Sequence, residues 1–100
     1  VTQLRLYANN YGIIRFRVES GAQNYDTAVS VGDTAKCIFR CSSGVVSAFY
    51  NGVKINTFTG VTMNFGKIQF GTALTSPKII RSLVFPTALT DAQCIELTTL

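Results

Sequence analysis

The chain has no histidine and only five acidic residues among its 100. Without histidine, neither a Ser-His nor a Cys-His nucleophilic arrangement can form, and a zinc site would depend on scattered cysteines and carboxylates. Glycoside hydrolysis usually needs two carboxylates that face each other across the bond. The acidic residues do not cluster at alternating positions of one strand. The sequence therefore predicts no catalytic residues, no metal site and no cofactor. A calcium ion at Asp26 or Asp33 is the alternative, although each is an isolated carboxylate expected in a loop and calcium takes several oxygen ligands.

Charge is scarce as well: charged residues make up 14% of the chain, hydrophobic residues 47%, and the net charge is +4. So few charges indicate that part of the surface is covered by a partner subunit or by more of the same polypeptide. The chain opens with Val1 inside a strand-like pattern, so we expect it to be a piece of a longer protein. No apolar run approaches the ~20 residues that a membrane span needs, which predicts no membrane insertion.

Cysteine is limited to Cys37, Cys41 and Cys94, an odd number that leaves at least one thiol unpaired. Four residues along a strand span roughly 13 Å, whereas the Cα atoms of a disulfide lie at most about 7 Å apart. Cys37 and Cys41 therefore cannot bridge each other, and we expect all three to be small buried hydrophobic residues.

What the sequence does contain is a series of short alternating runs typical of β-strands. Asn51-Gly52, between two such runs, is the strongest short-range signal for a hairpin with a two-residue turn. The expected strands are 2–7, 13–19, 25–31, 35–42, 45–50, 53–58, 67–71 and 78–85, with 61–65 as an uncertain ninth. Eight or nine short strands at regular spacing predict one all-β domain over residues 1–100, an antiparallel sandwich or barrel.

The pattern changes after Pro86, which cannot donate to a strand ladder. Thr90 and Gln93 have the spacing of a capping box. A short C-terminal helix of about two turns is therefore expected, with Cys94 and Leu97 on the same face.

Three ordered segments carry a resemblance to a known family: GVVSAFYNGV at 44–53, FGKIQFG at 65–71, and IRSLVFPTALTDAQCIEL at 80–97. Together they resemble the second half of a laminin-G-like domain of the concanavalin A-like lectin/glucanase superfamily. The runs at 12–18 and 32–39 resemble that family's preceding strand pair. The resemblance implies an antiparallel jelly-roll sandwich of two sheets with one short C-terminal helix, and N-terminal strands that are missing or reduced. Domains of this kind are common in bacteriophage tail fibres and tailspikes.

Basic residues supply one candidate site. Arg15 and Arg17 alternate out of one expected strand, and Lys36 and Arg40 out of another. If these strands pair as the family implies, the four cations share one sheet surface that suits an acidic polysaccharide. The alternative is a charged face that keeps the sheet soluble. Aromatic residues do not interleave with these cations, so nucleic acid is not an expected partner.

Two polar-aromatic loops supply other candidates, Asn10 with Tyr11 and Asn24 with Tyr25. A tyrosine ring offers a flat apolar face to a sugar, and amides bind its hydroxyls. The loops are expected at opposite ends of the strand 13–19, some ~25 Å apart, so they cannot form one site within a monomer. Ordinary turns are the alternative interpretation.

These features favour a non-catalytic binding or assembly module of a phage tail fibre or tailspike. Its expected location is the virion tail, and its expected partners are a cell-surface polysaccharide and further copies of the chain in a homotrimer. The alternative is a glycan-degrading, glucanase-like enzyme domain, which would need the paired acids that the chain does not show.

Overall fold

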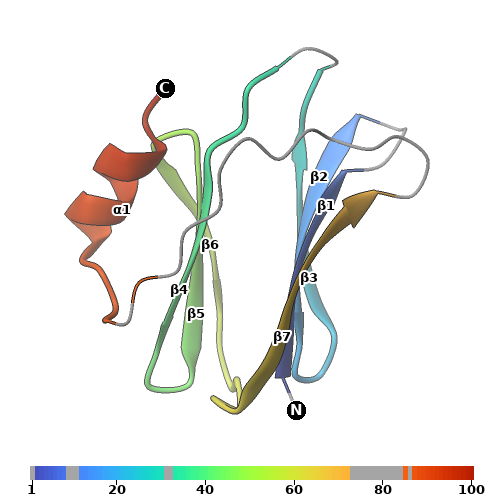
Figure 1. The fold of residues 1–100 in the computed structure, drawn as a ribbon, viewed down its shortest axis with the longest axis vertical. Helices are drawn as coiled ribbons and strands as arrows, with labels where there is room; N and C mark the ends of the chain where they lie inside the picture. Colours follow the sequence, from blue (N-terminus) through green and yellow to red (C-terminus); the bar gives the residue numbers. More distant parts are fainter. Residues whose placement is uncertain (1, 9–11, 31–32, 73–84, 86) are drawn as a thin grey trace. The chain divides into compact units, whose positions relative to one another are not determined.

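The computed structural model describes residues 2–8, 12–30, 33–72, 85 and 87–100 (Figure 1). Within these ranges the protein is mostly β, with seven strands in two sheets and one short C-terminal helix. The elements are β1 (Thr2–Ala8), β2 (Ile13–Glu19), β3 (Gln23–Ala28), β4 (Cys37–Ser42), β5 (Val45–Tyr50), β6 (Val53–Phe58), β7 (Phe65–Thr72) and α1 (Asp91–Thr98). The two-sheet, all-β class with its terminal helix is confirmed, and the jelly-roll topology remains a prediction.

The protein divides into two compact units. The first holds a four-stranded sheet in the order β3-β2-β1-β7, and the second holds a three-stranded sheet in the order β4-β5-β6 together with α1.

The first sheet corrects the expectation of a purely antiparallel fold. β2 pairs antiparallel with β1 and β3, but β7 pairs parallel with β1. The backbone N–H of Thr2 donates to the Asn64 carbonyl at 3.1 Å, which fixes the start of β1 beside the start of β7. Side-chain alternation is the same for either strand direction, so the sequence pattern could not distinguish the two arrangements.

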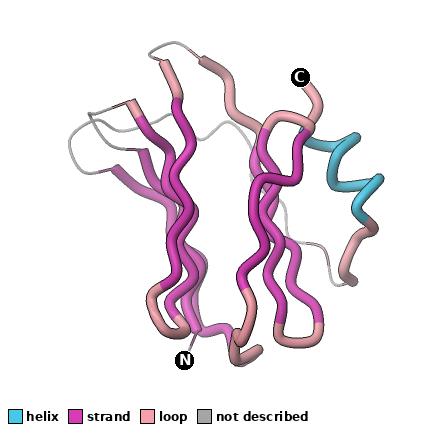
Figure 2. Tube along the Cα trace, turned by 180° about the vertical axis from the view of Figure 1, so that it is seen from behind, coloured by secondary structure: helices cyan, strands magenta, loops and turns pink. Residues whose placement is uncertain are grey.

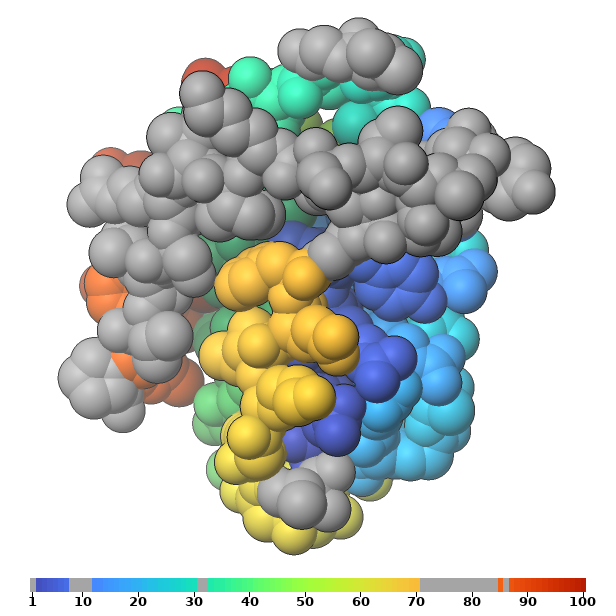
Figure 3. Space-filling view, turned by 45° about the vertical axis from the view of Figure 1, so that its right-hand side comes forward, coloured from blue at the N-terminus to red at the C-terminus, as the bar shows by residue number. Residues whose placement is uncertain are grey.

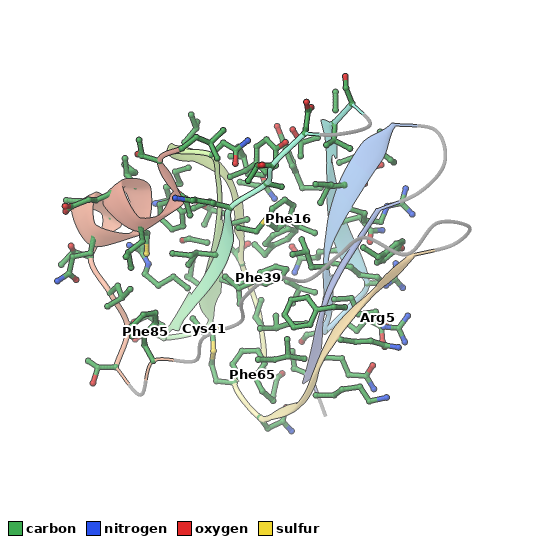
Figure 4. All side chains as sticks on the ribbon, turned by 45° about the horizontal axis from the view of Figure 1, so that its top comes forward. Arg5, Phe16, Phe39, Cys41, Phe65 and Phe85 are labelled. Atoms are coloured by element: carbon green, nitrogen blue, oxygen red, sulfur yellow. The ribbon has the colours of Figure 1, made fainter. Side chains whose placement is uncertain are left out.

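Alternation gives this sheet two chemically different faces. Leu4, Ile14, Phe16 and Val18 are buried on one face. The other face carries Arg5 from β1 and Arg15 and Arg17 from β2, the latter two as the alternation of 13–19 predicted. Figure 4 shows the labelled side chains of Phe16 and Arg5 on opposite sides of the sheet.

Two hairpins with two-residue turns build the second sheet. Ser43 and Gly44 connect β4 to β5, and Asn51 and Gly52 connect β5 to β6. All four residues have positive φ, for example 47° at Asn51 and 86° at Gly52. Two consecutive residues in this region are the signature of the turn that matches strand twist, so the Asn-Gly prediction is confirmed.

The Asn51 turn also organises its surroundings. The Asn51 side-chain oxygen accepts from the Lys36 backbone N–H at 2.8 Å, and its amide nitrogen donates to the Thr34 carbonyl at 3.3 Å. The Gly52 N–H donates to the Thr98 hydroxyl at 3.1 Å. One turn therefore holds both the segment that leads into β4 and the end of α1.

Helix α1 lies beside the strands of the three-stranded sheet (Figure 2) and contacts all three. Its predicted capping box is present, since the Gln93 N–H donates to the Thr90 hydroxyl and the Gln93 side chain accepts from the Thr90 N–H. The expectation that Leu97 shares the face of Cys94 is wrong. Thr98 is buried with Cys94 because its hydroxyl bonds the Cys94 carbonyl and the Gly52 N–H, while Leu97 is exposed.

Several strand boundaries differ from expectation: β3 ends at Ala28 rather than 31, and β7 spans Phe65–Thr72 rather than 67–71. β3 begins at Gln23 rather than 25, because the polar residues assigned to a loop pair with β2. β4 begins at Cys37, and residues 61–64 form no strand. The expected strand 78–85 lies outside the described residues except for Phe85. All three cysteines are free thiols.

Candidate functional site

The polar side of the four-stranded sheet gathers most of the charged side chains in the described part of the first unit, and we call it the arginine face. Cross-strand register places its residues in three rows. From β3 to β7 the rows are Asp26-Arg15-Tyr7, Asn24-Arg17-Arg5-Gln69, and Glu19-Gln3-Lys67. In Figure 3 the side chains of β7, in gold, lie against those of β1, in dark blue, with β2 in lighter blue beyond.

Arg15 is held at one end of this face. Its Nε and Nη2 donate to the two carboxylate oxygens of Asp26 at 2.7 and 2.9 Å, a bidentate pair that fixes the guanidinium plane. The guanidinium also lies 6.0 Å from the centre of the Tyr7 ring, within cation–π range. Among the arginines of this face, Arg15 is therefore the one whose guanidinium group is most fully engaged by contacts within the protein.

Glu19 is shared by the other two arginines. Arg17 Nε donates to Glu19 Oε1 at 2.8 Å, and Arg5 Nη1 lies 3.2 Å from the same oxygen. Arg17 Nη1 also donates to the Asn24 side-chain oxygen at 3.0 Å. Two cations thus converge on one carboxylate oxygen, with Lys67 adding a longer-range positive potential.

The arginines lower the pKa of both carboxylates on the face. The hydrogen bond from Arg17 lowers the pKa of Glu19, with Arg5 and Lys67 adding Coulombic stabilisation of its anion. The hydrogen bond from Arg15 lowers the pKa of Asp26, and the same bond raises the pKa of Arg15. The arrangement stabilises the ionised carboxylates, so neither is suited to donate a proton at neutral pH.

The expected common surface of four cations is wrong, because Lys36 and Arg40 do not belong to this sheet. Arg40 lies on β4, which pairs only with β5 among the described strands, and Lys36 precedes that strand. Lys36 Nζ donates to the Thr99 carbonyl at 3.1 Å. Arg40 donates to the carboxylate of Asp91 and lies over the Phe49 ring. Arg40 thus contacts the first turn of α1, and Lys36 contacts the residue that follows its last turn.

The polar-aromatic candidates are also separated. Asn24 and Tyr25 are neighbours within β3, not in a loop, so they point to opposite faces of the sheet. Asn24 pairs in register with Arg17 on the arginine face, while Tyr25 is opposite Phe16 on the apolar side. Asn10 and Tyr11 lie outside the described residues.

Arg5 is the residue of the arginine face that the sequence analysis did not include among the candidate site residues. Its alternation with Leu4 and Leu6 indicated an outward-pointing side chain, but alternation does not give the register between strands. The structure pairs Arg5 directly with Arg17 and places Gln69 on its other side. Arg5 therefore stands in the middle row of the face.

Comparison with known proteins adds no family: a scan of family models and searches of curated proteins and solved structures found no match. The laminin-G-like resemblance therefore remains a prediction. Across the described ranges, no helix is long and apolar enough to cross a membrane. In the same ranges, no three histidine, cysteine or acidic side chains gather as a metal site would require.

Proposed function

We propose that this chain is a non-catalytic module that binds an acidic cell-surface polysaccharide through the arginine face. The observation that carries the proposal is the register of that face, in which Arg5, Arg15 and Arg17 occupy adjacent positions of two neighbouring strands. Four cations against two carboxylates leave a positive excess there. A polymer with regularly spaced anionic groups can contact several of these cations at once.

The neutral side chains of the face suit a sugar as well. Gln3, Asn24 and Gln69 carry amides, which both donate and accept and can therefore bind sugar hydroxyls. Asn24 and Gln69 flank the two arginines of the middle row, and both are exposed. One row thus carries two adjacent cations with a hydroxyl-binding amide on each side.

The alternative of a glycan-degrading enzyme has less support. A glycosidase general acid must keep its proton near neutral pH, which requires a raised pKa. Glu19 and Asp26 have lowered pKa values because arginines donate to them. This electrostatic arrangement supports binding of an anion rather than protonation of a leaving group.

The parent protein that we propose is a phage tail fibre or tailspike, in which the module would attach the virion to its host. The laminin-G-like resemblance supports this context, and a polysaccharide ligand agrees with it. Fold-level analogy alone does not fix function, so the binding experiment has to decide.

The test is a titration of the protein with polygalacturonate and with neutral dextran, at low and at high salt. We expect polygalacturonate to bind and dextran not to bind. Binding should weaken at high salt because the Debye length falls from ~10 Å at 0.1 M to ~3 Å at 1 M. An Arg15→Gln/Arg17→Gln variant should bind more weakly than a Lys36→Gln/Lys54→Gln variant of equal charge. Equal affinity of the two variants would exclude the arginine face.

A role in homotrimer assembly is a second candidate, favoured by β7. This strand ends the sheet order among the described residues, and Phe65, Ile68 and Phe70 are exposed on it. Light scattering of the eluting protein should give three times the mass of the chain, and Ile68→Thr should reduce it. Lys67→Thr, on the other side of the same strand, is the matched control. A monomeric wild type would exclude this role.

A further inference from the structure

The middle row of the arginine face contains an unusual pair. Arg5 and Arg17 are direct cross-strand neighbours, and like charges in that position destabilise a sheet. Glu19 offsets the repulsion, because its Oε1 accepts a hydrogen bond from Arg17 and forms an ion pair with Arg5 at 3.2 Å. The two cations are therefore held together by a single carboxylate.

The hydrogen bonds of Arg5 are incomplete. Its Nε is buried and has no hydrogen-bond partner in the described part of the chain. Its Nη2 lies 3.5 Å from the Gln3 side-chain oxygen, beyond the usual range for such a bond. Buried unsatisfied donors are rare in folded proteins, and each one calls for an explanation.

We infer that Arg5 and Arg17 form a carboxylate-binding pair that Glu19 fills when no ligand is present. A uronic acid carboxylate of the polysaccharide would replace Glu19 and accept from both guanidinium groups. This inference rests on the proposed function and names the ligand chemistry of the same face. The replacement exchanges one carboxylate for another, so it needs no proton transfer and no bond cleavage.

A carboxylate fits this pair better than the neighbouring Arg15. Asp26 already occupies Arg15 with two short hydrogen bonds, whereas Glu19 contacts Arg5 and Arg17 through one oxygen. Arginine matches the two oxygens of a carboxylate in a planar, paired geometry. The amides of Asn24 and Gln69 lie at the two ends of the row, three strand spacings or ~14 Å apart, where hydroxyls of neighbouring sugars of the polymer would lie.

The experiment compares two conservative variants by calorimetric titration with polygalacturonate. Glu19→Gln removes the carboxylate that competes with the ligand, and Asp26→Asn removes an equal charge from the same face without freeing the pair. We expect Glu19→Gln to bind several-fold tighter than wild type and tighter than Asp26→Asn. Arg17→Gln should bind about tenfold more weakly, which corresponds to ~1.4 kcal/mol.

The outcomes separate this inference from the proposed function. If wild type binds polygalacturonate but Glu19→Gln binds no tighter than Asp26→Asn, the inference that Arg5 and Arg17 bind a ligand carboxylate is wrong. The proposal that the arginine face binds the polysaccharide would still hold. If wild type binds dextran sulfate but not polygalacturonate, the carboxylate-binding pair is wrong and the acidic-polysaccharide face stands. If it binds neutral dextran but not polygalacturonate, both proposals fail. If it binds only a single-stranded oligonucleotide, or no polymer, both proposals fail. Thermal unfolding of each variant checks that it is folded, and the pair Glu19→Gln and Asp26→Asn decides even if Arg17→Gln does not fold.

Discussion

Arg40 on β4 donates to the carboxylate of Asp91 in the first turn of α1. The same guanidinium lies 5.3 Å from the centre of the Phe49 ring, and its Nη2 donates to the Ser47 hydroxyl at 3.3 Å. Asp91 also favours the positive end of the helix. Arg40 thus joins a strand, its neighbour β5 and the start of the helix through one side chain.

Removal of Arg40 should weaken the second unit. We expect Arg40→Met to lower the free energy of unfolding by roughly 1–2 kcal/mol, because a cation–π contact and a hydrogen bond are lost together. Urea denaturation measures the change. Lys54→Met is the control, since Lys54 reaches Asp91 only at 3.4 Å and is more exposed. An equal loss in both variants would contradict the structural role of Arg40.

Gly52 and Gly21 form a matched pair for a second prediction. Both have φ of 86°, but a Cβ on Gly52 would lie 3.0 Å from the Thr99 hydroxyl, whereas a Cβ on Gly21 would meet nothing within 4 Å. Alanine at either position should cost ~1–2 kcal/mol for the left-handed backbone. Gly52→Ala should cost about 1 kcal/mol more, because the Thr99 hydroxyl, which donates to the Ile95 carbonyl at 2.7 Å, must give way to the new Cβ. Equal unfolding free energies for the two variants would show that α1 does not pack against the turn as described.

Ala22 adopts φ of 55° in the loop between β2 and β3, a conformation that alanine disfavours. Asparagine tolerates this region better than other non-glycine residues. We expect Ala22→Asn to raise the free energy of unfolding by ~0.5 kcal/mol, since local backbone strain is relieved. Ala22→Ser, which lacks that tolerance, is the control. A thermal midpoint no higher for Ala22→Asn than for Ala22→Ser would contradict the prediction.

The ion pair between Asp26 and Arg15 predicts that the free energy of unfolding depends on pH in the acidic range. The pKa of Asp26 in the folded protein lies below its ordinary value of 3.8, because Arg15 donates to the carboxylate. The pair therefore stabilises the fold fully above that value, and the contribution is lost as the pH falls through the folded-state pKa. We expect the unfolding free energies of wild type and Asp26→Asn to differ near neutral pH, to approach each other as the pH falls below 3.8, and to converge below the folded-state pKa of Asp26.

Arg15→Gln should show the same convergence with wild type, since it removes the other half of the pair. Urea denaturation across this pH range measures both variants. A difference between wild type and Asp26→Asn that stays constant into strong acid would mean that the ion pair does not contribute.

Much of the local structure could be predicted from the sequence. Asn51-Gly52 fixed one turn, and the Thr90-Gln93 spacing fixed the start of α1, because both signals act within a few residues. Pairing between strands acts over longer distances. The alternation in 13–19 and in 35–42 correctly predicted a strand in each run. Neither run contains a signal for its partner strand, so the sequence could not show that the two strands belong to different sheets.

The candidate site shows the same limit. Arg15 and Arg17 were correctly placed on one outward face, because alternation within a strand decides that. Arg5 was overlooked because its importance comes from the register of β1 against β2. Arg40 was wrongly assigned to the site. Its actual partner, Asp91 in α1, lies 51 residues away in the sequence, and no local pattern indicates that contact.

The most direct test of the account is an NMR titration of the labelled protein with oligogalacturonate, following the side-chain signals of arginine, asparagine and glutamine. We predict shifts at Arg5, Arg17 and Asn24 that saturate together, with the Arg40 signal unchanged. Shifts confined to the second unit, or no shift at a concentration that saturates binding by calorimetry, would contradict the proposal that the arginine face binds the polysaccharide.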